Sequence, residues 1–258
     1  MMNIDGLSRV MEEVASLAWA EDWDNCGVLL RSRSGNVDHI AVALDPTAEI
    51  VRSASSAGCD CLVTHHPLIF SPLRRLDPSI PSNAAVFELI ERDMSILCCH
   101  TSWDNSPVGT NVSLANSIGL GSVEPMLFEN RGWGIGAVGN LESRSFRTLA
   151  LSAKDRWRLS FARLHGDPDR TVSKVALCGG SGGSLWRDAL AAGAEVYITA
   201  DVKYHDVQDA VASGLSVLEV DHGEMEWASM GDLAAHVGRL SGLDTLLLER
   251  PSCSGELV

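Results

Sequence analysis

The feature of the sequence that most restricts its fold is an internal repeat without gaps. Residues His39–Thr64 align with Lys174–Thr199 at a constant offset. Each copy has the sequence pattern of a β-strand, then a turn, then a helix that ends at a glycine, and then a second strand. The repeat predicts an α/β protein made of two similar βαβ lobes related by an internal duplication. The residues of the first copy that recur unchanged in the second are Ala41, Arg52, Ala54, Ala57, Gly58 and Thr64.

Length and charge narrow the class of protein. The chain has 258 residues, a hydrophobic fraction of 45% and a net charge of -14, which suits a globular protein of one large domain or two lobes. So acidic a surface argues against binding to nucleic acid or anionic membranes, although it does not exclude a small anionic substrate. The seven cysteines lie mostly in apolar segments, as reduced thiols do. We expect a cytoplasmic protein, because no apolar run approaches a membrane span and no signal-peptide pattern opens the chain.

Two adjacent histidines stand where one buried strand is expected to end. The apolar run Cys61–Thr64 is followed by His65 and His66, and Pro67 then stops the strand and favours a turn. Neighbouring side chains of a strand point to opposite faces, so both rings can serve one site only if the chain turns there. A solvated or capping pair of histidines is the competing interpretation.

Two further strand ends carry the same residue types. Each expected strand is followed by a histidine and, four residues later, by a carboxylate: His100 with Asp104, and His222 with Glu226. If the chain becomes helical after the strand, residues four apart lie on one face and can bind one ion. Sites in open α/β sheets form at the carboxyl ends of the strands, so three such strand ends predict a metal site.

Two loops are also rich in residues of functional type. The segment Glu21–Gly27 combines carboxylates, an amide and Trp23, and its simplest interpretation is a capped turn with Trp23 in the core. The glycines of residues 179–183 precede a helix, where backbone amides can bind a phosphate. No P-loop lysine follows, so we interpret this second loop as a tight turn.

Six motifs, taken together, resemble the Ngg-interacting-factor-like family, whose bacterial members are named type-two GTP cyclohydrolase I homologues. The motifs occur in the family's order across nearly the whole chain, and the set is far more specific than any one of them. They are Trp23–Gly27, Thr64–Pro67, His100–Asp104, Cys178–Gly182, Thr199–His205 and His222–Glu226.

This resemblance implies two α/β lobes with a dinuclear metal site in the cleft between them, and assembly into a homohexameric ring. We place the first lobe, carrying most metal ligands, at residues 1–124 and 220–258, and the second lobe at residues 125–219. Such a site suits two divalent ions per chain. We expect these ions to be zinc, iron or manganese rather than calcium, which prefers oxygen ligands throughout. Asp104 and Glu226 are the candidates for carboxylates that bridge the two ions. The ligands carried over by motif are His65, His66, Asp104, His222 and Glu226.

Three residues are candidates for proton transfer. His100 either orients a metal ligand or shuttles a proton, and we favour the first role. His205 and Glu224 are acid or base candidates, although a histidine on a helix face and a solvated glutamate are at least as consistent with the sequence. We therefore count His100, His205 and Glu224 as the candidate catalytic residues.

The predicted function is a dinuclear metal-dependent hydrolase similar to GTP cyclohydrolase I type 2. Five side chains cannot saturate two ions, so positions stay open for water and for a small-molecule substrate. A metal-bridging hydroxide would attack a nucleotide or related heterocyclic compound, with GTP as the leading substrate. The alternative is a non-catalytic metal-binding scaffold or regulatory protein assembled as a ring.

Overall fold

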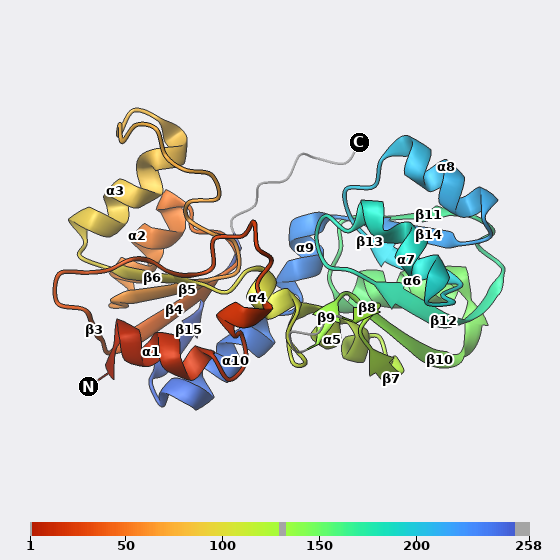
Figure 1. Cartoon of the computed structure of the whole chain (residues 1–258), viewed down its shortest axis with the longest axis horizontal. Coiled ribbons are helices and arrows are strands. Elements are labelled where there is room, and N and C mark those ends of the chain that lie inside the picture. The colour runs from red at the N-terminus through yellow and green to blue at the C-terminus, as the bar shows by residue number, and fades with distance from the viewer. Residues whose placement is uncertain (1, 129–132, 251–258) are drawn as a thin grey trace. The chain divides into compact units, whose positions relative to one another are not determined.

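The chain folds into two compact units. The computed structural model describes residues 2–128 and 133–250 (Figure 1). Among the described residues, unit 1 comprises 2–103 and 230–250, and unit 2 comprises 104–128 and 133–229. Each unit has a mixed α/β fold with one main β-sheet and helices on both of its faces. The α/β class that the repeat predicts is therefore present in both units.

The boundaries of the units differ from those expected at residues 124 and 220. The strand β7 (Gly121–Glu124) pairs with β10 (Ala137–Ser145), so it belongs to the sheet of unit 2. The helix α9 (His222–Trp227) follows β14 (Ser216–Val220) of the same sheet, and the chain leaves unit 2 only after Ser229. The motif that contains His222 and Glu226 is thus part of unit 2.

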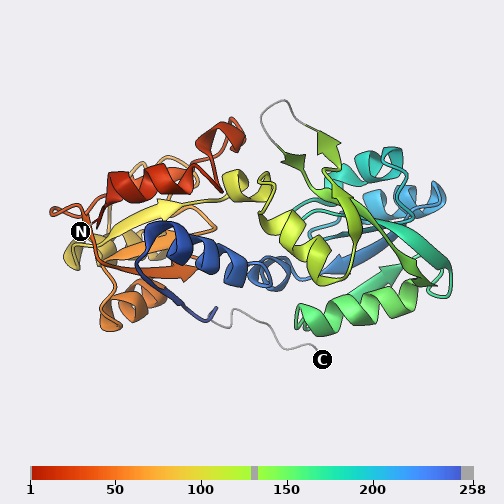
Figure 2. The same ribbon diagram turned by 90° about the horizontal axis from the view of Figure 1, so that it is seen from below.

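Unit 1 contains a five-stranded sheet in the order β15-β4-β5-β6-β2, in which only β2 runs antiparallel to its neighbour. The helices α2 and α3 cover one face of this sheet through side chains such as Ile50 and Leu89, and α1 and α10 cover the other (Figures 1 and 2). The elements of unit 1 are β1 (Met2–Asn3), α1 (Ile4–Met11), η1 (Leu17–Trp19), β2 (Gly27–Leu30), β3 (Asn36–Val37), β4 (His39–Ala43), α2 (Ala48–Ser56), β5 (Cys61–Thr64), η2 (Pro81–Asn83), α3 (Ala84–Glu91), β6 (Ser95–Cys98), α4 (Thr101–Asp104), whose last residue opens unit 2, α10 (Met230–Ser241) and β15 (Asp244–Leu247).

Unit 2 contains a six-stranded sheet in the order β11-β14-β13-β12-β10-β7, with β12, β13 and β14 parallel. The helices α5 and α6 pack on one face around Phe146, and α7 and α8 pack on the other around Trp186. Besides β7, β10, β14 and α9, the elements are α5 (Thr110–Ser117), β8 (Leu127–Phe128), β9 (Gly134–Ile135), α6 (Phe146–Arg156), β11 (Ala162–His165), β12 (Thr171–Leu177), η3 (Gly183–Leu185), α7 (Trp186–Ala191), β13 (Val196–Thr199) and α8 (Tyr204–Ala212).

Of the helices that the structure describes, none combines the length and the apolar character needed to cross a membrane.

The two copies of the sequence repeat form strand–helix–strand units of the same register. Ile40 pairs with Cys61 across the parallel strands β4 and β5, and Val175 pairs with Val196 across the parallel strands β12 and β13. These two pairs stand at equivalent positions of the sequence alignment. The residues that follow β5 and β13 therefore lie at equivalent ends of the two sheets, which is where the candidate ligands of unit 1 begin.

Each copy also has an acidic side chain that fastens the start of its first strand. Asp60 accepts hydrogen bonds from two backbone amides around the start of β4, at 3.0 and 3.3 Å. At the equivalent position Glu195 accepts hydrogen bonds from the backbone amides of Ser173 (2.7 Å) and Lys174 (3.0 Å) in β12. The hydrogen bonds from Ser173 and Lys174 hold the pKa of Glu195 below its usual value.

Replacement of Glu195 by alanine is expected to lower the free energy of unfolding by about 1–3 kcal/mol at neutral pH, because two amides of β12 lose their acceptor. A carboxyl whose folded pKa is lowered stabilises the protein above its unfolded pKa, and this contribution disappears as the pH falls through the folded value. The difference in the free energy of unfolding between the wild type and Glu195→Ala should therefore become smaller at acidic pH. Urea denaturation across this pH range measures it, with the exposed Glu142→Ala as control. Equal losses for both variants would contradict the role of Glu195.

Candidate metal centre

Three histidine rings of unit 1 gather at the carboxyl ends of β5 and β6. The backbone amides of His65 and His66 donate to the carbonyls of Ala43 (3.2 Å) and Leu44 (2.9 Å), so the chain keeps its pairing with the neighbouring strand as it turns. The ring centroids lie 5.1 Å apart for His65 and His66, and 5.2 and 5.6 Å from the ring of His100. One ring nitrogen from each of the three lies within 4.8 Å of the other two, so this cluster could hold a metal ion.

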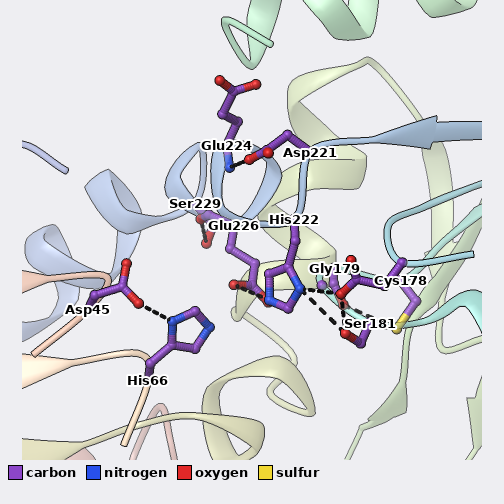
Figure 3. A network of polar contacts seen from close by, with 12 residues as sticks. Asp45, His66, Cys178, Gly179, Ser181, Asp221, His222, Glu224, Glu226 and Ser229 are labelled. Carbon is purple, nitrogen blue, oxygen red and sulfur yellow. Dashed lines mark hydrogen bonds and ion pairs between the residues drawn. The ribbon is translucent and has the colours of Figure 1, made fainter. Parts of the chain in front are cut away.

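Carboxylates orient two of these rings. His66 donates from Nδ1 to Asp45 at 2.7 Å, as Figure 3 shows, and His100 donates from Nδ1 to Asp24 at 2.9 Å. A histidine that ligates a metal usually donates its other ring nitrogen to such an acceptor, which fixes the tautomer and the direction of the ring. In both rings Nε2 is therefore the candidate ligand atom.

Asp24 is the anchor of the loop that precedes β2. Its fully buried carboxylate also accepts hydrogen bonds from the backbone amide (3.0 Å) and hydroxyl (2.5 Å) of Thr101, the first residue of α4. Burial opposes ionisation of Asp24, but the hydrogen bonds from His100, Thr101 and Cys26 outweigh it and hold the pKa of this carboxyl far below its usual range. Asp24 thus holds His100 and the start of α4 together through hydrogen bonds to its carboxylate.

The candidate ligands of unit 2 follow β14. Asp221 caps α9 by accepting a hydrogen bond from the backbone amide of Glu224 at 2.8 Å, so the helix begins at His222. One turn later Glu226 lies with Oε2 3.1 Å from His222 Nε2, while His222 Nδ1 donates to Asp201 at 2.7 Å (Figure 3). The predicted spacing of four residues therefore does place a histidine and a carboxylate on one helix face.

His222 lies between two carboxylates, those of Asp201 and Glu226. The hydrogen bond to Glu226, together with the charges of Glu226 and Asp201, raises the pKa of His222 to about 9. Ser181 donates a further hydrogen bond to Asp201, so the glycine-rich turn supports the residue that orients His222. The two carboxylates thus favour a positive charge at this position.

A glycine makes room for Glu226 in unit 2. Gly180 has a φ of +66°, and a Cβ atom there would lie 2.3 Å from Glu226 Oε1 and 3.2 Å from His222 Nε2. Next to this glycine, burial and the charges of Asp104 and Glu226 raise the pKa of the Cys178 thiol to about 12.

The other two candidates for proton transfer are placed less favourably. The carboxylate of Glu224 accepts hydrogen bonds from the backbone amide (2.6 Å) and hydroxyl (2.9 Å) of Ser160, so it joins α9 to the start of β11. His205 lies on the exposed part of α8, where its Nδ1 is 3.3 Å from Gln208. His100, by contrast, belongs to the histidine cluster and is a candidate ligand as well as an orienting residue.

The sequence reasoning missed the carboxylates that orient the rings, which are Asp24, Asp45 and Asp201. A usable signal was present for each. Asp45 and Asp201 stand two residues after β4 and β13, which lie beside histidine-bearing strands. Asp24 shortly precedes β2, which is antiparallel to β6, so the start of β2 lies at the edge where β6 ends. Carboxylates at the same sheet edge as the histidines are natural partners for them.

The donor types fit a first-row transition metal or zinc. Imidazole nitrogen suits these ions, whereas calcium and magnesium prefer oxygen ligands throughout. The fold and these side chains define the class of protein as a mixed α/β protein with a possible histidine- and glutamate-lined metal site. The family model of Duf34/NIF3 (NGG1p interacting factor 3) matches residues 2–249. The chain therefore belongs to the Duf34/NIF3 family, and the predicted resemblance is confirmed.

Relatives and solved structures agree with this assignment. A protein of Streptomyces coelicolor named GTP cyclohydrolase 1 type 2 homolog is 35% identical over 217 residues, which is 81% of this chain and 76% of that protein. A Streptococcus pneumoniae protein of the same name is 34% identical over 203 residues, 77% of each chain. The crystal structure of a Bacillus cereus protein related to NIF3 has a TM-score of 0.93 at 20% identity, covering 100% of this chain and 99% of that one. The last comparison shows the fold.

Proposed function

We propose that this chain is a divalent-metal-dependent hydrolase, similar to the proteins named GTP cyclohydrolase 1 type 2 homolog, which acts on a nucleotide or related heterocyclic compound. The observation that carries the proposal is the cluster of His65, His66 and His100, in which carboxylates orient two of the three rings. Clustered imidazoles whose other ring nitrogens are held by carboxylates are typical of a site that holds a cation.

The proposed ligands are His65, His66, Asp104, His222 and Glu226, with two ions per chain, and His100 is added as a candidate from the structure. When bound, such ions supply Lewis acidity that polarises an electrophilic carbon and makes water a stronger acid. The chain's own residues supply orientation: Asp45, Asp24 and Asp201 fix the rings of His66, His100 and His222. The position of the centre between the lobes stays a prediction.

A non-catalytic metal-binding scaffold is the second candidate, and one observation favours it. Of the three residues considered for proton transfer, Glu224 is engaged by Ser160, and His205 lies on the exposed part of α8. A hydrolase that expels a nitrogen leaving group needs an acid close to it. In the hydrolase proposal His100, whose Nδ1 is held by Asp24, fills this role in place of metal ligation, because a ring nitrogen bound to a metal has no proton to donate.

The product of GTP turnover distinguishes the chemistries. Metal-loaded protein should release formate from GTP if the imidazole ring of the purine is opened, and phosphate if a phosphoester is cleaved. We expect formate, and we expect Asp104→Ala to abolish its release. Release of phosphate alone would indicate a phosphohydrolase instead. If a panel of nucleotides yields neither formate nor phosphate, the non-catalytic scaffold is favoured.

The internal duplication and the homohexameric ring belong to the same proposal. The common strand register of the two repeat units and the equivalent roles of Asp60 and Glu195 support the duplication. The hexamer rests on the family resemblance. Light scattering should give six times the mass of the chain, and a stable monomer would contradict the ring.

A further inference from the structure

We propose that the loop of residues 67–83 in unit 1 is the nucleotide subsite, where a base stacks on Phe70 and Trp23 and phosphate groups bind Arg74 and Arg75. The proposal rests on the proposed function, because it assigns the place where that substrate is held. It concerns residues of unit 1 alone and no metal ligand.

The loop borders an open cavity of about 630 Å³, which is lined by Pro67–Arg75 together with Ile80 and Asn83. Two amide side chains hold its backbone in place. Asn25 donates to the carbonyl of Ile69 at 2.6 Å, and the buried Asn83 donates to the carbonyls of Arg75 (2.9 Å) and Asp77 (3.3 Å). The cavity is therefore organised before any ligand binds, and its volume falls in the usual range for small-molecule sites.

Two aromatic rings are exposed beside this cavity. Phe70, which lines it, is 60% exposed, and Trp23 is 62% exposed, so the expectation that Trp23 fills the core is wrong. Their centroids lie 5.9 Å apart at an interplanar angle of 63°, and His100 lies 6.1 Å from Trp23 and 6.4 Å from Phe70. Exposing two large rings costs free energy unless a ligand covers them. Their contact with His100 connects the cavity to the histidine cluster.

The charges of the loop select an anionic ligand. Arg74 and Arg75 line the cavity and are exposed, and within residues 2–128 and 133–250 neither forms an ion pair. Asp77, the nearest acidic residue in the sequence, directs its carboxylate to Ser79, whose amide and hydroxyl donate to it at 2.9 and 2.7 Å. In a chain of net charge -14, two adjacent guanidinium groups without acidic partners are a distinct local feature. Guanidinium groups bind phosphate oxygens in a bidentate way.

An aromatic platform next to two arginines matches a molecule that is flat at one end and anionic at the other. A nucleotide meets both conditions, because any base stacks on an aromatic ring and its phosphates bind arginine. A long nucleic acid is disfavoured, because the remaining surface is strongly acidic and would repel it.

Equilibrium binding of GTP, guanosine and inorganic tripolyphosphate to the full chain tests the assignment, first after chelation of metals and then after metal loading. Phe70→Ala is expected to weaken the binding of GTP and of guanosine about tenfold, because stacking is lost. The double variant Arg74→Ala/Arg75→Ala is expected to weaken GTP and tripolyphosphate about tenfold and to leave guanosine unchanged. Phe70→Tyr should bind as the wild type does.

Each control variant removes the same residue types as its test variant, but outside the proposed subsite. Phe128→Ala removes another exposed aromatic ring, and Arg33→Ala/Arg187→Ala removes two other exposed arginines, so neither control should change the affinity. Unchanged GTP affinity in the Phe70 and arginine variants, or binding that requires metal, would overturn the subsite. GTP binding without hydrolysis would support the subsite and contradict the proposed hydrolase. Hydrolysis of GTP with an unchanged KM in Phe70→Ala would support the hydrolase and contradict the subsite.

Discussion

Protein in which His65, His66 or Glu226 is replaced by alanine is expected to retain at least one divalent ion fewer per chain than the wild type. His65 is 1% exposed and Glu226 is 3% exposed, so both side chains are placed where a bound cation would be shielded from water. Removing a ligand from such a site leaves too few donors to offset the dehydration of the ion. Metal content measured by mass spectrometry after dialysis against metal-free buffer gives the result directly.

His165→Ala is the matched control for these variants. His165 is also a part-buried histidine at a strand end, but its Nε2 lies 2.9 Å from Glu219 of the neighbouring strand, as expected for a structural residue. The control should keep the metal content of the wild type. Wild-type metal content in all of the ligand variants would show that the assigned residues are not the ligands.

Gly180→Ala is expected to reduce metal binding as strongly as Glu226→Ala does, although it removes no ligand. The new methyl group would lie 2.3 Å from Glu226 Oε1, so either the carboxylate or the backbone of the turn must move. Glu226 is buried on α9 and has little free space around it. A displaced carboxylate would lose its place beside His222 Nε2, and the two side chains could no longer bind one ion. The same measurement of metal content applies, together with thermal unfolding.

Gly214→Ala separates this effect from backbone strain. Gly214 also belongs to unit 2 and has a φ of +88°, but a Cβ atom there would meet nothing within 4 Å. Both variants should lose about 1 kcal/mol of stability through the left-handed backbone conformation, and only Gly180→Ala should lose metal. Equal metal content in the two variants would contradict the position assigned to Glu226.

Much of the fold followed from local pattern in the sequence. The strand–helix–strand units of the repeat were predictable because short apolar runs, helix spacing and the glycines that end the helices follow in the same order in both copies. Helical spacing extends further than the helix itself at the start of the chain: apolar residues continue at that spacing to Leu17, but α1 ends at Met11 and Leu17 begins a short 3-10 helix. Periodicity records which side chains are buried, and a bent segment can bury them as well as a helix does.

The histidines of the candidate site were predictable from the sequence alone, whereas the carboxylates that orient them become recognisable only when the order of the strands is known. Histidines after strands are visible in the sequence, but the pairing of His66 with Asp45 depends on β4 lying beside β5, which is a property of the sheet. The exposure of Trp23 was also hidden, because a tryptophan is usually buried and only the path of the loop places it outside. The boundary at Asp104 could not be seen because α4 continues without a break in composition.

The most direct test of the central claim is the rate of GTP turnover as metal is added to chelated protein. The proposed hydrolase predicts no formate release without metal, a rate that rises until about two ions are bound per chain, and no recovery in Asp104→Ala at any metal concentration. Turnover that is equal with and without metal, or that Asp104→Ala retains in full, would contradict the assignment of a metal-dependent hydrolase to this chain.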